Sequence, residues 1–216
     1  AAFDRRDGCG CAQSAGGSPR VKLVLASGSA ARRKMLEAAG LTFEVDAPRV
    51  DEEAAKASLR AEGLKPRDQA DALAELKALS VSRTRPDFVI GADQMLAVGG
   101  EVFDKPKDIE EARRHLVRLR GQTHELITAA VVAREGAIVW RHIDTPKLKM
   151  RAFSDAFLDD YMSRAGERVL RSVGAYQLEG LGAQLFEKVD GDYFSVLGLP
   201  LLPLLAFLRE HGFARP

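Results

Sequence analysis

Cysteine is scarce in this 216-residue chain, which holds only Cys9 and Cys11, close to its N-terminus. Two neighbouring cysteines cannot make a disulfide framework, and a CxC pair without further ligands is a weak metal signal. We interpret them as a reduced, disordered pair. Apolar runs are short as well. None reaches the roughly 18 residues that a membrane span requires, so we expect no membrane partner.

A surplus of one charge is also missing. The chain has 32 Lys and Arg against 31 Asp and Glu, a formal net charge of +1. So small a field does not favour nucleic acid or a membrane surface as a partner. Residues 1–20 (AAFDRRDGCGCAQSAGGSPR) lack the apolar core of a signal peptide and read as a flexible leader. We therefore predict a cytoplasmic protein with a single domain over residues 21–216.

Several catalytic motifs are absent too. The sequence contains no HExxH and no paired CxxC, which disfavours a zinc site. No serine lies in a GxSxG turn and the four histidines are scattered, which disfavours a Ser-His-Asp site. The GxxxxGKS/T phosphate loop is missing as well, so any phosphate-binding site would have to be built from other residues.

What the chain does contain begins with a strand, a tight turn and a helix. The apolar run at residues 21–26 meets an SGS turn whose last residue, Ser29, is a good N-cap for a helix at residues 30–39. A helix N-terminus offers free backbone N–H groups to an anion. Arg32 and Arg33 in its first turn oppose the helix dipole unless a phosphate sits there. The alternative is two solvated arginines.

The central stretch, residues 88–106, is predicted to be a hairpin with charges at both ends. An apolar strand is expected to stop at Gly91-Ala92, just before Asp93, and a later GG turn brings the chain back to Asp104 and Lys105. A carboxylate and a lysine at strand ends suit a phosphate ester with a divalent cation. The alternative is a surface hairpin with a solvated ion pair.

Two helical stretches add further charged candidates. An acidic cluster that contains Glu52 precedes one helix, where plain capping is one interpretation and a metal ligand is the other. Lys77 lies beside the apolar stripe of a helix predicted at residues 69–82. It is either a snorkelling lysine or a phosphate ligand.

The remaining pattern indicates a mixed sheet. A basic helix, three strands, a further helix, a final hairpin and an apolar helix are predicted, in that order, at residues 109–120, 123–133, 137–142, 147–152, 154–162, 183–196 and 199–211. Strands and helices alternate in the first half and strands predominate later. We therefore predict an α/β fold with a mixed sheet.

Six charged side chains lie at element edges or beside apolar runs: Arg32, Glu52, Lys77, Asp93, Lys105 and Glu179. Three are cations that suit phosphates, and three are acids that supply oxygen ligands to a hard metal ion. Such a set favours phosphoryl or nucleotidyl hydrolysis with magnesium, in which a carboxylate orients the attacking water.

Eight short motifs between about residue 22 and the end carry a resemblance to one family: LASGSAARRKML, VDEE, LAELKA, GADQ, DKP, GQTH, YQLEGLG and VLGLPL. Together they resemble the Maf family of nucleoside triphosphate pyrophosphatases. The resemblance implies an elongated, twisted, mixed β-sheet flanked by helices, with a nucleotide cleft between two lobes. The chain departs from the family at Ala30, where a proline is usual.

The resemblance also implies roles for the candidates. Asp93 would be the catalytic proton acceptor, and Glu52 with Asp93 would hold a divalent cation, magnesium or alternatively manganese. The triphosphate would be bound by Ser29, Arg32, Lys77 and Lys105. The implied reaction is hydrolysis of a nucleoside triphosphate between its α and β phosphates, a house-cleaning step in nucleotide metabolism. A homodimer is left open.

Three positions bear on the choice of base. Gln94 and Glu179 resemble the branch that acts on 7-methyl-GTP, which has the DQ pair and the EGLG turn. A glutamate there suits a guanine, whose edge offers two donors to one carboxylate. The third position is usually tryptophan in that branch, whereas Ala31 cannot stack on a methylated base. The alternatives are a pyrophosphatase that prefers dTTP and UTP, a phosphatase that releases orthophosphate, and a non-catalytic, nucleotide-binding regulator of cell division.

Overall fold

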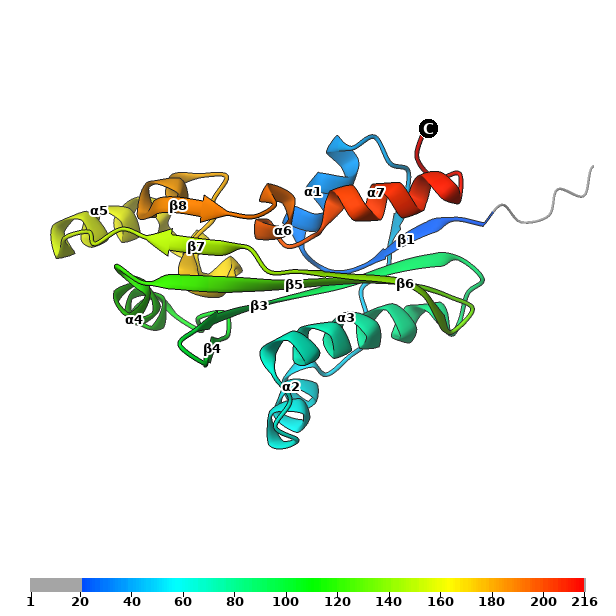
Figure 1. Cartoon of the computed structure of the whole chain (residues 1–216), viewed down its shortest axis with the longest axis horizontal. Helices are drawn as coiled ribbons and strands as arrows, with labels where there is room; N and C mark the ends of the chain where they lie inside the picture. The colour runs from blue at the N-terminus through cyan, green and yellow to red at the C-terminus, as the bar shows by residue number, and fades with distance from the viewer. Residues whose placement is uncertain (1–20, 216) are drawn as a thin grey trace, which may run out of the picture.

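The computed structural model describes residues 21–215, so the expected leader with its cysteine pair lies outside the described residues. These residues form an elongated eight-stranded sheet with helices on both faces (Figure 1). The strands are β1 (Leu23–Ala26), β2 (Glu44–Val45), β3 (Phe88–Val98), β4 (Glu101–Phe103), β5 (Thr123–Arg134), β6 (Ala137–Asp144), β7 (Lys147–Met150) and β8 (Phe186–Asp190). The helices are α1 (Ala30–Ala38), α2 (Glu52–Ala61), α3 (Pro66–Ser82), α4 (Ile109–Leu119), α5 (Asp155–Ala165), α6 (Tyr193–Val196) and α7 (Leu201–Glu210). Three short 3-10 helices are η1 (Gly166–Arg171), η2 (Val173–Ala175) and η3 (Leu181–Leu185).

The sheet is mixed, as the sequence predicts. Its strand order is β2-β1-β3-β5-β7-β8, with β4 added to β3 and β6 added to β5. β1 runs parallel to β2 and β3, whereas β5 is antiparallel to β3, β6 and β7. The predicted α/β fold, with an elongated mixed sheet flanked by helices, is therefore confirmed. None of the helices between residues 21 and 215 has the length and apolarity that a bilayer crossing requires.

Local capping signals are confirmed where the sequence carries them clearly. The side chains of Ser29, Asp108 and Ser154 cap α1, α4 and α5, each accepting a hydrogen bond from the backbone N–H three residues further on. Gly99 and Gly100 have φ values of 58° and 87° and make the two-residue turn between β3 and β4. These signals depend only on neighbouring residues, which explains why they can be identified without tertiary information.

The predicted end of the first central strand at Gly91 is wrong. β3 continues through Asp93, and what ends there is its parallel neighbour, because Ala26 at the end of β1 pairs with Gly91. A Cβ atom on Gly91 would lie 2.3 Å from the carbonyl oxygen of Ala74 and 2.6 Å from the amide nitrogen of Ala78. This glycine therefore allows α3 to pack closely on the strand and does not terminate it.

The predicted final hairpin over residues 183–196 is wrong in its second half. β8 pairs antiparallel with β7, but Tyr193–Val196 forms the single-turn helix α6. The side chain of Asp192 accepts a hydrogen bond from the amide of Ser195 at 2.7 Å, which is an N-cap. That cap outweighs the strand propensity of the aromatic residues in the turn.

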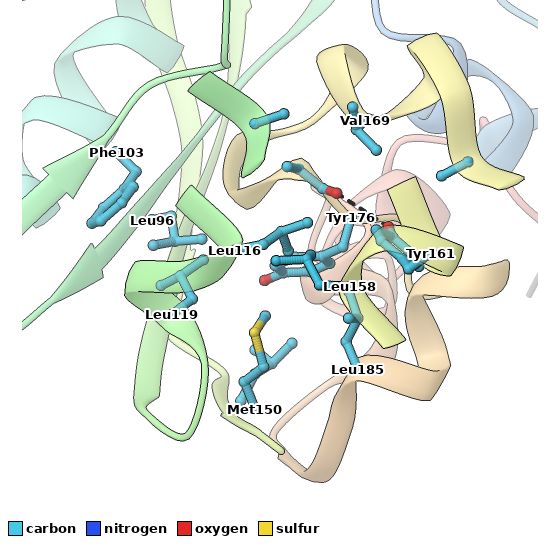
Figure 2. Close-up of a cluster of buried hydrophobic side chains, with 14 of the residues drawn as sticks. Leu96, Phe103, Leu116, Leu119, Met150, Leu158, Tyr161, Val169, Tyr176 and Leu185 are labelled. Atoms are coloured by element: carbon cyan, nitrogen blue, oxygen red, sulfur yellow. Dashed lines mark hydrogen bonds between the residues drawn. The ribbon is translucent and has the colours of Figure 1, made fainter. Parts of the chain in front are cut away.

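Apolar side chains gather at both ends of the long sheet. At one end, with α4, α5 and β7, a cluster includes Leu96, Leu116 and Met150, and the Tyr161 hydroxyl donates to the Ala175 carbonyl at 3.1 Å (Figure 2). At the other end α1 and α7 cover one face and α3 covers the opposite one (Figure 1). The two ends correspond to the two expected lobes, and a nucleotide cleft between them stays a prediction.

We expect Gly91→Ala to lower the free energy of unfolding by about 3 kcal/mol, because its Cβ would collide with backbone atoms of α3 that cannot rotate away. Urea-induced unfolding would measure the change. Gly28→Ala is the matched control, since among the described residues no heavy atom beyond the chain neighbours of Gly28 lies within 4 Å of a Cβ built there. Equal stability of the two variants would contradict the close packing.

Candidate active site

The candidate residues collect where β1 stops and β3 continues beside it. The chain leaves β1 at Ala26 and enters α1 through the turn at Ser27. It leaves β2 at Val45 and enters α2 at Glu52. Both connections therefore follow the carboxyl ends of parallel strands, the edge at which α/β proteins place ligands. Asp93, two residues beyond the last paired position of β3 with β1, faces this edge.

A buried ion pair occupies the centre of this region. Lys77 Nζ on α3 lies 2.8 Å from Asp93 Oδ1 and 2.9 Å from Glu52 Oε2 on α2. Lys77 is 5% exposed and Asp93 is 6% exposed, so both charges are removed from water. From the sequence, Lys77 is either a snorkelling lysine or a phosphate ligand. In the structure its amine does not extend to solvent but contacts the carboxylates of Asp93 and Glu52.

One oxygen of this pair has no partner among residues 21–215. Within these residues Asp93 Oδ2 is buried and accepts no hydrogen bond, although Oδ1 accepts one from Lys77. Buried polar atoms are nearly always satisfied, so an orphaned carboxylate oxygen needs an explanation. A water molecule, a hydroxyl group or a cation supplied with a ligand would satisfy it. Asp93 therefore has the free lone pairs that a proton acceptor or metal ligand needs.

Glu52 is available to the site because another residue caps its helix. Asp51 is the N-cap of α2 and accepts a hydrogen bond from the amide of Ala54 at 3.0 Å. The Glu52 side chain can therefore reach Lys77. Partial burial works to raise the pKa of Glu52, but the hydrogen bond and charge of Lys77, helped by Lys56, lower it below its ordinary value. Glu52 is thus held as a carboxylate.

Arg32 is built into the same edge from α1. Its Nε donates to the carbonyl of Gly198 at 2.7 Å, and Nη1 donates to the carbonyl of Ala92 at 2.9 Å and to Ser27 Oγ at 3.2 Å. Ala92 lies on β3, one residue beyond Gly91, the last position that pairs with β1. The arginine therefore binds β3 just past the point where its pairing with β1 ends. With 8% of its surface exposed, Arg32 is not a solvated arginine.

The charge of Arg32 acts on the central pair. Burial lowers the pKa of the Arg32 guanidinium from its ordinary value, and the negative charges of Asp93 and Glu52 oppose that shift. The adjacent Arg33 behaves differently. It is exposed and pairs with Glu37 on its own helix at 2.7 Å. Of the two arginines predicted in this turn, only Arg32 belongs to the candidate site.

Lys105 shares the electrostatic surroundings of the same groups. It follows β4 and is exposed as a residue. The pKa of Lys105 is lowered, first by loss of water around its amine and then by the charge of Arg32, while Glu52 and Asp93 act in the opposite direction. Lys105 thus shares the electrostatic surroundings of Arg32, Glu52, Lys77 and Asp93. A polyphosphate would relieve the repulsion between the cations.

The remaining candidates are Ser29, Ala31 and Glu179. Ser29 Oγ accepts from the amide of Arg32 at 3.4 Å, so this hydroxyl caps α1, and Ala31 is half-buried in the same turn. Glu179 is exposed in the segment between η2 and η3. Within residues 21–215 no hydrogen bond or ion pair joins Glu179 to the other candidates. Two small cavities lie beside α5, and neither is lined by Arg32, Lys77 or Asp93.

Gln94 connects the site to the segment around α6. Its Nε2 lies 2.8 Å from Thr128 Oγ1 and 2.9 Å from the carbonyl of Ser195. Because neighbours in a strand point to opposite faces, Gln94 lies across the sheet from the Asp93 side chain. The contact partners Thr128 and Ser195 and the Gly198 carbonyl were missed by sequence reasoning. Only the VLGLPL motif could have pointed to Gly198, and it says nothing about which side chain the carbonyl accepts from.

Two carboxylates of the candidate site, those of Asp93 and Glu52, could bind a metal ion. In the part of the chain that the structure describes, no three His, Cys, Asp or Glu side chains are grouped so that they could hold a metal ion. Asp93 Oδ2 and Glu52 are hard oxygen donors that fit magnesium or manganese. Two carboxylates with a lysine between them are a sparse set, so the other ligands would have to come from substrate and water.

Comparisons with known proteins agree on one family. A family model described as Maf-like protein matches residues 22–211. A protein of Caulobacter vibrioides named nucleoside triphosphate pyrophosphatase is 56% identical over 190 residues, which cover 88% of this chain and 96% of the relative. A protein of Rhizobium etli named 7-methyl-GTP pyrophosphatase is 52% identical over 192 residues, with 88% and 96% covered. One from Mesorhizobium japonicum with the same name is 51% identical over the same shares.

We expect Lys77→Met to lower the free energy of unfolding of the nucleotide-free protein by about 3 kcal/mol, because it leaves Asp93 buried without a cation. The double variant Lys77→Met/Asp93→Asn should recover most of that loss, since the buried carboxylate that lost its cation is then neutral and only the half-exposed Glu52 is left without Lys77. Urea-induced unfolding of Lys77→Met, Asp93→Asn and the double variant would give the three values. Arg33→Met, which removes an exposed cation, is the control and should change stability by about 0.5 kcal/mol at most. Additive losses in the double variant would refute a coupled pair.

Proposed function

The chain belongs to the Maf family, and on that premise we propose that it hydrolyses a nucleoside triphosphate to a nucleoside monophosphate and diphosphate. The observation that carries this proposal is the buried Lys77–Asp93 pair, with its orphaned oxygen, at the end of β1. Its support comes also from relatives that are named pyrophosphatases and match almost their whole length. The chain is then a hydrolase acting on phosphoric anhydrides.

The cations of the site suit the triphosphate. Arg32, Lys77 and Lys105 would neutralise its negative oxygens, and the N-terminus of α1 behind Ser29 would add backbone N–H donors. Arg32 is fixed by three acceptors and needs no rearrangement to present its charge. Fixed donors of this kind stabilise developing charge in a transition state without a cost of reorganisation.

Asp93 would act on the water. Its free Oδ2 would accept a proton as the water oxygen bonds to the α-phosphorus, and the bond from that phosphorus to the bridging oxygen would break. Diphosphate would leave with the bridging oxygen. Lys77, hydrogen-bonded to Oδ1, would hold the carboxylate in one orientation, so that Oδ2 faces the incoming water.

Glu52 and Asp93 are the residues that would hold a divalent cation, magnesium or manganese. When bound, the ion would withdraw charge from the phosphate oxygens and lower the barrier to displacement. Glu52 fits this role because its carboxylate is half-exposed, stays ionised and reaches the same amine as Asp93. Lys56 and Lys77 would balance the charge that the two acids carry before nucleotide arrives.

We further propose that the preferred base is a guanine of the 7-methyl-GTP type. Glu179 is exposed and free to accept from the N1–H and N2–H₂ donors of guanine. Gln94 would contribute its carbonyl oxygen, because its nitrogen is committed to Thr128 and the Ser195 carbonyl. Relatives that carry the 7-methyl-GTP name support this choice. Ala31 contributes no ring, so the methyl group itself would add little.

Replacing the proposed proton acceptor tests the reaction. Asp93→Asn should lower kcat for diphosphate release by about 10²–10⁴-fold, because it removes general-base help. Diphosphate and orthophosphate would be followed separately with a nucleotide panel and magnesium. Asp159→Asn, the same change in an exposed ion pair with Arg113 on α4, is the control and should keep full activity. Orthophosphate as the first product, or no turnover by the unaltered protein, would contradict the proposal.

A comparison of bases tests the specificity residues. We expect kcat/KM for 7-methyl-GTP and GTP to exceed that for UTP and dTTP, and Glu179→Gln to reduce the purine advantage about ten-fold or more by removing a charged acceptor. Steady-state kinetics on the five nucleotides 7-methyl-GTP, GTP, dTTP, UTP and CTP would give the ratios. A Glu179→Gln variant with an unchanged order of substrates would exclude this residue from base recognition.

A further inference from the structure

The helix that supplies Glu52 is weakly attached to the rest of the fold. α2 extends from Glu52 to Ala61 and contains no buried residue. Only Ala55 and Leu59 pack, partly buried, against the core cluster beneath α3. In Figure 1 the helix lies at the periphery, on the far side of α3 from the sheet. Apolar burial of this size does not fix a helix firmly, so its position must depend on other contacts.

Those contacts lie along one stripe of the helix. Glu52, Lys56 and Arg60 are spaced four residues apart and therefore share a face of α2. At one end of the stripe Glu52 meets Lys77 at 2.9 Å. Lys56 Nζ and Arg60 Nη2 both meet Asp104, at 3.1 Å and 2.8 Å. All three charged residues of the stripe are thus engaged by groups at or next to the candidate site.

Asp104 receives both cations with separate oxygens. Lys56 binds Oδ1 and Arg60 binds Oδ2, so the carboxylate is held at two points. Partial burial works to raise the pKa of Asp104, but the hydrogen bonds from Arg60 and Lys56 lower it below its ordinary value. A depressed folded-state pKa means that the contact stabilises the fold above the unfolded pKa and is lost as pH falls through the folded one. The contact is therefore complete at neutral pH.

The contact of Asp104 with α2 also affects Lys105, the next residue in the sequence. Asp104 immediately precedes Lys105, so the ion pairs that hold α2 also hold the backbone that carries this lysine. The same helix presents Glu52 to Lys77 and Asp93. A single carboxylate therefore links the helix that carries Glu52 to the backbone that carries Lys105 at the end of β4.

We propose that Asp104 is a positioning residue, which binds Lys56 and Arg60 of α2 and thereby fixes the separation of Glu52 and Lys105 across the triphosphate. This rests on the proposed function for its catalytic meaning, but the attachment of α2 does not. Displacement of a reacting or binding group by about 1 Å can cost about 10²-fold in rate, so a modest loosening has a measurable effect.

The other interpretation is that these are ordinary surface ion pairs, which contribute little. Two observations favour the positioning role. The Lys56 side chain is only 18% exposed, and Asp104 bridges two cations instead of one. The chain also offers a matched comparison: Asp159 pairs with Arg113 across two helices far from the site, with 64% of its side chain exposed.

The first measurement follows the attachment of α2 without nucleotide. Amide hydrogen exchange over residues 53–61 should be about ten-fold faster in Asp104→Asn than in the unaltered protein. Asp104→Glu, which keeps the charge, should restore slow exchange, and Asp159→Asn should leave these amides unchanged. Unchanged exchange in Asp104→Asn would overturn the proposal, whatever reaction the protein catalyses.

The second measurement links the attachment to the reaction. Asp104→Asn should lower kcat/KM for the best nucleotide about ten-fold, the double variant Lys56→Met/Arg60→Met should do the same, and the triple variant should be no worse than either. Asp104→Glu should recover activity to within about three-fold, and Asp159→Asn should be fully active. Additive losses in the triple variant would refute a shared contact. Faster exchange without turnover by the unaltered protein would instead contradict the proposed function alone.

Discussion

The structure depends on one buried contact, the hydrogen-bonded ion pair between Lys77 and Asp93. Removing two charges from water is unfavourable unless each finds its partner with good geometry, so the surrounding fold must hold α3 and β3 at a fixed separation. Gly91 permits that separation because a side chain there would collide with the backbone of α3. The ion pair therefore depends on the close packing of α3 at Gly91, two residues before Asp93. A gap or a shift in that packing would leave the Asp93 carboxylate unpaired.

Because β1 ends at Ala26, its backbone does not cover the edge of β3 beside the Lys77–Asp93 pair. Had β1 continued beyond Ala26, its backbone would have occupied the edge of β3 beside Asp93. Instead the chain turns into α1, and Arg32 donates to the free Ala92 carbonyl that a further residue of β1 would have bonded. The exposed edge of a strand is thus converted into a charged site. Strand termination, helix capping and the charged side chains of the candidate site fall within the same few residues, at the kind of edge where α/β proteins place their sites.

The sequence predicts those parts of the fold whose signals are local. Caps, the GG turn and the alternation of strands and helices are all confirmed, because each is decided by neighbouring residues. The end of a strand at Gly91 was predicted wrongly, since a glycine that interrupts a strand and one that accommodates a helix look alike in a sequence. The aromatic turn after Gly191 has the composition of a strand, but the Asp192 side chain caps it as the single-turn helix α6. In the site, Arg32, Lys77, Asp93 and Glu52 do converge. The carbonyl acceptors that orient Arg32, and the cations that engage Asp104, have no sequence signature, because they are brought together only by tertiary packing.

We propose that a triphosphate is bound and cleaved beside the Lys77–Asp93 pair. A crystal structure with magnesium and a nucleotide whose α–β bridge is a methylene group tests it most directly, because the analogue binds without being cleaved. We expect an α-phosphate facing Asp93 Oδ2, with phosphate oxygens bound by Arg32 and Lys105. A triphosphate bound elsewhere on the protein, with the ion pair untouched, would contradict it.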